Sequence, residues 1–199
     1  MKKYLKKIIP KKWHRKFHEK NKLHMRSAMK RISSRAINIG TIIDVGASDG
    51  RWTMQTMDYF PNANYLLVEA NPIHKENLKE LSGKSDNISY EIVAASNKNG
   101  YVNFDADEPF GGKAEPDDCA NPIKVKSVRL DDLINSRTDL ELPFFVKLDT
   151  HGYEIPIIEG ALDIISKASL IVIETYNFQI AKDSLIFDEM VSYMRSKGF

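Results

Sequence analysis

Residues 41–50 read Thr-Ile-Ile-Asp-Val-Gly-Ala-Ser-Asp-Gly and join a short apolar run to a turn that contains Gly46 and Gly50. The apolar run predicts a buried strand, and the two glycines allow a tight turn in which a ligand can approach the backbone closely. The turn lacks the three-glycine pattern with which dinucleotide-binding folds hold a pyrophosphate, and acidic residues surround it. We therefore expect a ligand that carries a positive charge and ribose hydroxyls in place of phosphates.

The same alternation of apolar runs and helical stretches continues through the rest of the chain. Further strands are expected at residues 65–69, 88–94, 144–149 and 170–174, and helices at 51–59, 72–83, 155–166 and 185–197. Two extra strands, 101–104 and 124–128, are expected around a loop at 105–122 that is rich in Asp, Gly and Pro. This order is typical of an α/β fold with a parallel sheet, in which ligands bind at the carboxyl ends of the strands.

Acidic residues stand at the ends of four of the five main strands, at Asp44, Glu69, Asp149 and Glu174. Glu69 lies 19 residues after Gly50, where an acid at the end of the second strand can accept hydrogen bonds from both ribose hydroxyls. The alternative is a solvated acid at the end of a strand, and the glycine turn by itself would leave that alternative favoured. Combined with the glycine turn, Glu69 favours a ligand with an adenosyl group.

These residues and several later segments resemble a known family. Residues 44–50 and 68–72 are similar to the S-adenosylmethionine-binding half of class I methyltransferases, whose Rossmann-like sheet has flanking helices. The segments 94–104, 128–133, 145–154 and 159–161 narrow the resemblance to the FkbM type. The resemblance implies S-adenosylmethionine-dependent methylation of a hydroxyl on a glycan, a sugar or a related metabolite. Its motifs imply cofactor contacts at Asp44, Gly46, Ala47, Gly50, Glu69, Ala70, Ala95 and Ser96.

His151 and Asp149 are the expected catalytic residues, because they follow the fourth main strand near the place where the methyl group should lie. An alkyl hydroxyl is a very weak acid, so its attack on a methyl group needs a base or a metal ion. Histidine suits a base, although His151 stands where many family members have Glu, and a packing or capping role is equally open. Asp149 could position the substrate, pair with Lys147, or bind a divalent cation together with Glu174. Because these roles stay open, no metal ion is among the expected cofactors.

Smaller expectations concern residues near the site. Asp131 and Asp132 are expected to cap the short helix that follows them, and His74 is expected on the surface. The loop at 105–122 is either a substrate lid or a solvated variable loop, because it is long, acidic and near the carboxyl edge of the sheet.

The charge is divided unequally along the chain. Residues 1–35 hold fourteen Lys and Arg against one acid, whereas the remaining residues carry an excess of acids, so the net charge is only +2. We therefore divide the chain into a basic amphipathic extension, residues 1–38, and a methyltransferase domain, residues 39–199. Four apolar residues of the extension are spaced four apart, namely Leu5, Ile9, Trp13 and Phe17. This spacing predicts two short helices there.

The basic extension fits three roles: a helix packed on the domain or a solubilising tail, a contact with an anionic membrane surface, or a contact with nucleic acid. Nucleic acid is the least favoured partner, because the acidic domain would repel a polyanion. No apolar run reaches the length of a membrane span, and the lone Cys119 can form no internal disulfide. The expected location is the cytoplasm, with peripheral attachment to a membrane as an addition.

The sequence given stops at Phe199, where the family would enter its last two sheet strands. Without those strands, residues 170–174 would form an open sheet edge unless a homodimer partner or the basic extension covers it. The expectation is therefore either a shortened open reading frame or a protein that depends on a dimer.

Two other functions fit parts of the sequence. The absence of the last strands would suit a non-catalytic binding module that keeps the methyltransferase fold. The basic extension would suit a nucleic-acid methyltransferase, although the sequence carries no base-methylation motif of the Asn-Pro-Pro-Tyr kind.

Overall fold

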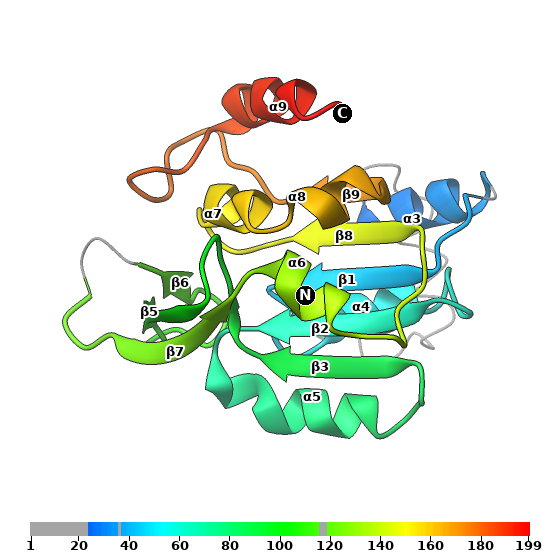
Figure 1. The fold of residues 1–199 in the computed structure, drawn as a ribbon, viewed down its shortest axis with the longest axis horizontal. Coiled ribbons are helices and arrows are strands. Elements are labelled where there is room, and N and C mark those ends of the chain that lie inside the picture. Colours follow the sequence, from blue (N-terminus) through cyan, green and yellow to red (C-terminus); the bar gives the residue numbers. More distant parts are fainter. Residues whose placement is uncertain (1–23, 36, 116–118) are drawn as a thin grey trace, which may run out of the picture.

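A computed structural model describes residues 24–35, 37–115 and 119–199 of the chain. Its main sheet has five parallel strands in the order β3-β2-β1-β8-β9 (Figure 1). The strands are β1 (Thr41–Val45), β2 (Asn64–Glu69), β3 (Ile88–Ile92), β8 (Phe144–Leu148) and β9 (Ala168–Ile173). The helices expected around residues 5–17 lie outside the described residues.

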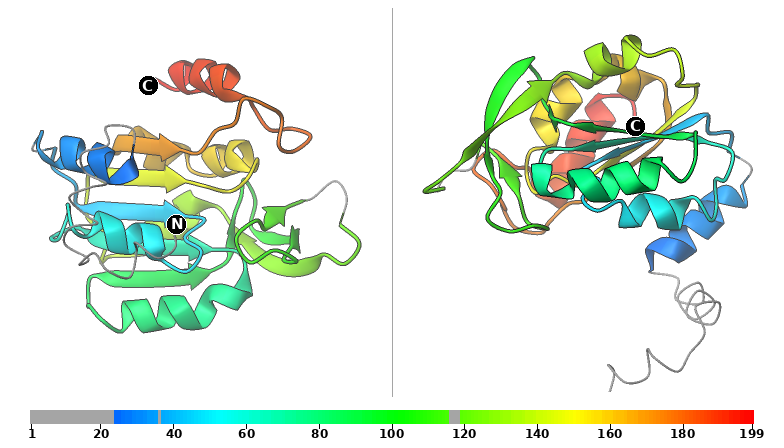
Figure 2. Two further views of the ribbon diagram at one scale, coloured as in Figure 1. Left: turned by 180° about the vertical axis from the view of Figure 1, so that it is seen from behind. Right: turned by 90° about the horizontal axis from the view of Figure 1, so that it is seen from below.

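Helices cover both faces of this sheet (Figure 2). One face carries α3 (Met25–Ser33), α4 (Arg51–Thr56), the 3₁₀ turn η1 (Pro72–His74) and α5 (Lys75–Ser82). The other carries α6 (Leu130–Asn135), α7 (Glu154–Glu159), α8 (Leu162–Ser166) and α9 (Phe187–Ser196). Every residue of the central strands β1 and β8 is buried, as expected for parallel strands that are covered on both faces.

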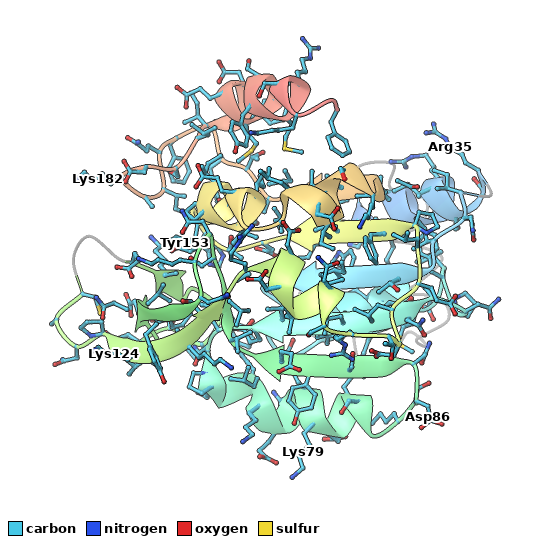
Figure 3. The ribbon with its side chains drawn as sticks, viewed as in Figure 1. Arg35, Lys79, Asp86, Lys124, Tyr153 and Lys182 are labelled. Atoms are coloured by element: carbon cyan, nitrogen blue, oxygen red, sulfur yellow. The ribbon has the colours of Figure 1, made fainter. Side chains whose placement is uncertain are left out.

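A second, four-stranded sheet lies beyond the carboxyl ends of the main strands (Figure 1). It contains β4 (Ala94–Ala95), β5 (Gly100–Asp105), β6 (Lys113–Ala114) and β7 (Ile123–Val128) in the order β4-β7-β5-β6. Tyr153, labelled in Figure 3, connects the two parts, because its hydroxyl lies 3.2 Å from Ser96 Oγ just after β4. The second sheet therefore forms a wall beside the edge where ligands bind.

Two expected elements are interrupted in the structure. The strand expected at 88–94 is divided between the sheets, since β3 ends at Ile92 and β4 begins at Ala94. The helix expected at 155–166 is divided into α7 and α8 around Gly160. A Cβ atom on Gly160 would lie 1.9 Å from the carbonyl oxygen of Ser96, so only glycine fits against the backbone there.

The expected capping role of Asp131 and Asp132 was wrong. Both residues lie inside the first turn of α6 and not before it. The Asp131 carboxylate instead accepts hydrogen bonds from the backbone N–H groups of Asp163 (3.3 Å) and Ile164 (3.1 Å), at the start of α8. Asp132 accepts a hydrogen bond from Asn99 Nδ2 at 2.7 Å.

At one edge of the main sheet, β9 pairs with β8, and no other described strand joins it. Side chains of α9 pack on the same apolar cluster as β9, including the buried Met190 and Met194. In the part of the chain that the structure describes, no helix is both long and apolar enough to cross a membrane.

Replacing Asp131 with Ala should lower the free energy of unfolding by about 1–2 kcal/mol, because the first N–H groups of α8 lose their acceptor. Urea denaturation followed by circular dichroism measures this change. Asp132→Ala, one residue away and exposed, is the control and should cost less than about 0.5 kcal/mol. Equal losses for both variants would contradict the capping role of Asp131.

Candidate active site

A cavity of about 500 Å³ opens at the carboxyl ends of β1, β2 and β8. Its walls come from the turns after these strands, from the second sheet with the loop before β6, and from the start of α3 and α4. The volume lies within the range of small-molecule sites. Seven residues expected at the site line it: Gly46, Ala47, Glu69, Ala70, Ala95, Asp149 and His151.

Three other expected cofactor residues, Asp44, Gly50 and Ser96, are not among the lining residues. Asp44 is fully buried in β1, and the buried Ser96 lies with its Oγ 3.2 Å from the hydroxyl of Tyr153, which does line the cavity. Gly50 lies against Leu81 of α5, where an added Cβ would approach a methyl group to 2.5 Å. These three residues shape the cavity from behind its surface.

Glu69 at the end of β2 is the central acceptor on the β1–β2 side of the cavity. Its two carboxylate oxygens accept hydrogen bonds from Ser48 N (2.6 Å) and Asn71 N (2.7 Å). Burial raises the pKa of Glu69 above its usual value, and the two N–H groups oppose that rise. A carboxylate offers about four acceptor positions, so both oxygens can still accept hydrogen bonds from a ligand.

The turn after β1 requires glycine at position 46. Gly46 has a φ of +74°, and a Cβ atom there would lie 1.9 Å from the carbonyl oxygen of Asp149. The turns that follow β1 and β8 are therefore in direct backbone contact, which brings the Glu69 side and the Asp149 side into one cavity.

Lys147, a charged residue in the buried strand β8, holds these two turns together. Its Nζ lies 2.9 Å from Asp44 Oδ1 and 3.2 Å from Asp149 Oδ2, and it donates a hydrogen bond to the Gly46 carbonyl at 2.8 Å. Thr53 Oγ1 of α4 donates a hydrogen bond to Asp44 Oδ2 at 2.7 Å. Burial alone would lower the pKa of Lys147, but the attraction of both carboxylates raises it.

The pairing of Asp149 with Lys147 was one of the roles that the sequence left open, whereas the participation of Asp44 was missed. A lysine and an aspartate within two otherwise apolar strands were the available signal, because buried charges are almost always paired.

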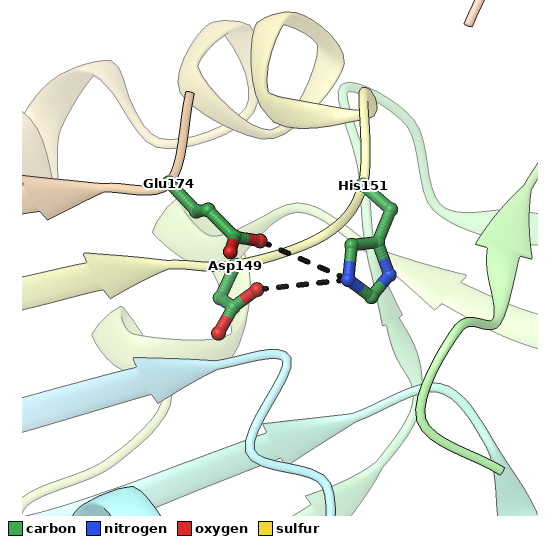
Figure 4. A group of neighbouring side chains, drawn as sticks. All are labelled: Asp149, His151 and Glu174. Atoms are coloured by element: carbon green, nitrogen blue, oxygen red, sulfur yellow. Dashed lines mark ion pairs between the residues drawn. The ribbon is translucent and has the colours of Figure 1, made fainter. Parts of the chain in front are cut away.

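Asp149, His151 and Glu174 converge beyond β8 and β9 (Figure 4). His151 Nε2 lies 3.7 Å from Glu174 Oε2 and 3.9 Å from Asp149 Oδ1. We call these three residues the acceptor trio. Glu174 is far from the other two residues in the sequence, yet the adjacent strands β8 and β9 place all three at one edge of the sheet.

The backbone at His151 adopts a conformation that is rare for any residue except glycine, with a φ of +53°. Such a conformation costs of the order of 1 kcal/mol and is often found at functional sites. The ring Nδ1 lies 3.4 Å from the carbonyl oxygen of Gly112, in the loop before β6. Because a carbonyl oxygen can only accept, a hydrogen bond between these two atoms is donated by Nδ1. Nε2 is then the ring nitrogen that faces the two carboxyl groups.

The two carboxyl groups of the trio titrate differently. Burial tends to raise the pKa of Asp149, but hydrogen bonding with Glu174 and the charge of Lys147 lower it below its usual value. The hydrogen bond with Asp149 raises the pKa of Glu174, and burial adds to that rise. Asp149 is therefore the more acidic member of the pair.

The expectation that His74 lies on the surface was wrong. His74 is 4% exposed, and its Nε2 lies 2.6 Å from the Pro109 carbonyl of the loop that follows β5. The Phe110 ring of the same loop lies 5.6 Å from the His74 ring and 4.5 Å below the Arg51 guanidinium. Four residues of the loop and β6 line the cavity: Pro109, Phe110, Gly112 and Ala114. Part of the loop expected at 105–122 thus lines the cavity.

Known proteins resemble this chain in sequence and in fold. A family model described as the methyltransferase FkbM domain matches residues 44–199. The curated "2-O-methyltransferase NoeI" of Sinorhizobium fredii (strain NBRC 101917 / NGR234) is 26% identical in an alignment of 151 residues, and the alignment covers 67% of this chain and 62% of that protein. This chain thus spans less than two thirds of the length of that relative.

Solved structures show the same fold. A methyltransferase FkbM from Methylobacillus flagellatus KT superimposes with a TM-score of 0.55 at 17% identity, over 79% of this chain and 37% of that one. The chain therefore has the Rossmann-like fold of class I methyltransferases.

Replacing Lys147 with Met should lower the free energy of unfolding by about 3–5 kcal/mol, because Asp44 would remain buried without its cation. Chemical denaturation measures the loss, and the exposed Lys126→Met on β7 is the matched control. Adding Asp44→Asn to Lys147→Met should recover part of the lost stability, since the buried charge is then removed. A loss that is the same with and without Asp44→Asn would contradict the pairing.

Proposed function

Because this chain belongs to the FkbM methyltransferase family, we propose that it transfers the methyl group of S-adenosylmethionine to a hydroxyl of a sugar, glycan or related metabolite. The observation that carries the proposal is that Glu69 and the acceptor trio line one cavity from two sides. One side suits a ribose and the other a hydroxyl group, as a methyl transfer between them requires.

The residues on the β1–β2 side fit S-adenosylmethionine. Glu69 is buried and keeps free acceptor positions for ribose hydroxyls, while Gly46 and Ala47 leave the backbone open to a ligand. Ala70 and Ala95 add small side chains to the wall. Neutral or cationic groups suit this surface better than phosphates, because the nearby acids Glu69 and Asp149 would repel an anion.

The acceptor trio is the place for the hydroxyl that receives the methyl group. When bound, S-adenosylmethionine supplies a methyl group on a sulfonium, which is already an electrophile, so the chain has to align an oxygen and remove its proton. Asp149, His151 and Glu174 offer three acceptor atoms to a hydroxyl at the cavity edge. The loop that contains Pro109 and Phe110 covers the cavity and would limit the entry of water.

The relative NoeI supports an oxygen acceptor, since it is named a 2-O-methyltransferase. The alignment covers 67% of this chain, and we extend the class of acceptor, a hydroxyl, to this chain. Incubation with a panel of sugars, with S-adenosylhomocysteine formation as the readout, tests the proposal. Cofactor binding without transfer to any hydroxylated acceptor would favour a non-catalytic binding module.

Replacing Glu69 with Gln should weaken the binding of S-adenosylmethionine about 10- to 100-fold, because ribose hydroxyls lose a charged acceptor. Isothermal titration calorimetry measures the affinity, and Asp49→Asn, in the same turn but paired with Arg51, is the control. An analogue without the 2′-hydroxyl should show a much smaller difference between wild type and Glu69→Gln. An equal difference for both ligands would show that Glu69 does not bind the 2′-hydroxyl of the ribose.

Replacing His151 with Ala should reduce kcat at least about 100-fold and change the dissociation constant of S-adenosylmethionine less than about threefold, because the trio faces the acceptor and not the ribose. Steady-state kinetics and calorimetry on the same preparation provide the two numbers. A large loss of cofactor affinity with unchanged kcat would remove His151 from the acceptor side.

A further inference from the structure

We propose that Asp149, His151 and Glu174 bind one divalent cation of the Mg²⁺ or Mn²⁺ class. The sequence left cation binding open for Asp149 together with Glu174, and the structure places His151 beside them as a candidate third ligand. Binding of the cation does not depend on the proposed methyl transfer, whereas the catalytic role given to it below rests on that proposed function.

The spacing of the trio suits chelation of a single ion. One ligand atom from each residue lies within 4.8 Å of the other two, with Nε2 at 3.7 Å and 3.9 Å from the carboxylate oxygens. Metal–ligand distances of about 2.0–2.3 Å place the ligand atoms of one ion about 3–4.5 Å apart. The same separations are too long for direct hydrogen bonds from Nε2 to either carboxylate.

The ring of His151 is oriented as in known metal sites. A ligating histidine commonly donates its other N–H group to a backbone carbonyl, which fixes the tautomer and directs the lone pair to the metal. Nδ1 of His151 meets the Gly112 carbonyl at 3.4 Å, from the loop that also covers the cavity. Its Nε2 is therefore the nitrogen that faces Asp149 and Glu174.

The carboxylates of the trio are also held by outer contacts. Lys147 contacts Asp149 through Oδ2 and leaves Oδ1 to face His151. Tyr176 donates its hydroxyl to Glu174 Oε2 at 2.8 Å. Such hydrogen bonds to ligating carboxylates orient them and are typical of the surroundings of a metal ion.

The local charge balance favours a cation of charge +2. Lys147 is shared by Asp44 and Asp149, and Glu174 adds a third carboxylate next to Asp149. Three carboxyl groups around one ammonium give the edge of the cavity more acidic than basic side chains. Two carboxylates and one imidazole suit Mn²⁺ or Mg²⁺ better than the soft ions that prefer thiolates.

The cation would activate the acceptor. Its role is to coordinate the hydroxyl oxygen, which lowers the pKa of that hydroxyl. As the O–H bond breaks, the proton passes to a water molecule at the mouth of the cavity. The oxygen then uses an electron pair to form the bond to the methyl carbon, and the pair of the broken C–S bond stays on sulfur. His151 is in this case a ligand and not the base.

Titration of the full chain with Mn²⁺, after treatment with EDTA and buffer exchange, tests the site. Electron paramagnetic resonance reports free Mn²⁺, and we expect one ion bound per chain. His151→Ala and Glu174→Gln should each weaken binding at least about 10-fold. Glu76→Gln, the same change on the exposed first turn of α5, is the matched control and should bind like wild type.

Other results would overturn the proposal. Absence of stoichiometric binding would do so, as would unchanged binding in both trio variants, since the ion would then lie elsewhere. Calorimetry with S-adenosylmethionine on the metal-free protein separates this failure from a failure of the proposed function. Methyl transfer that EDTA does not reduce, in a chain that binds no Mn²⁺, would leave the proposed function intact and make His151 the base.

Discussion

The buried ammonium of Lys147 is the constraint on which the site depends. It joins Asp44 in β1, the carbonyl of Gly46 in the turn that follows, and Asp149 after β8. A buried lysine that lost these partners would be strongly destabilising, so the two adjacent strands must keep their register. The same contacts fix which oxygen of Asp149 faces His151, and thereby connect the stability of the sheet with the geometry of the acceptor trio.

The second sheet gives the cavity its other wall. Its loop contributes Gly112 to orient His151 and Pro109 to contact His74, so residues before β6 act on both sides of the cavity. The main sheet alone would leave the carboxyl edge open to water. With both walls in place, electrostatic interactions inside the cavity are stronger, because water is partly excluded.

The position of the β1–β2 side of the cavity was largely predictable from sequence because its signals are local. The glycine at position 46 and the acid at position 69 each stand at the end of an apolar run, and strand order then places them together. The position of the acceptor trio was only partly predictable. Asp149 and His151 could be named, but their distances to Glu174 depend on how β8 and β9 pair and on the unusual backbone of His151.

The sequence by itself determined the alternation of strands and helices, the glycine turn and the acids at the strand ends, since apolar periodicity and turn chemistry act over a few residues. Only the tertiary structure decided which distant residues the polar side chains contact. Asp131 caps a helix 32 residues away, His74 is buried by the loop over the cavity, and Asp44 meets a lysine 103 positions later. Such contacts depend on which distant segments pack side by side, and the local sequence around each residue does not predict that packing.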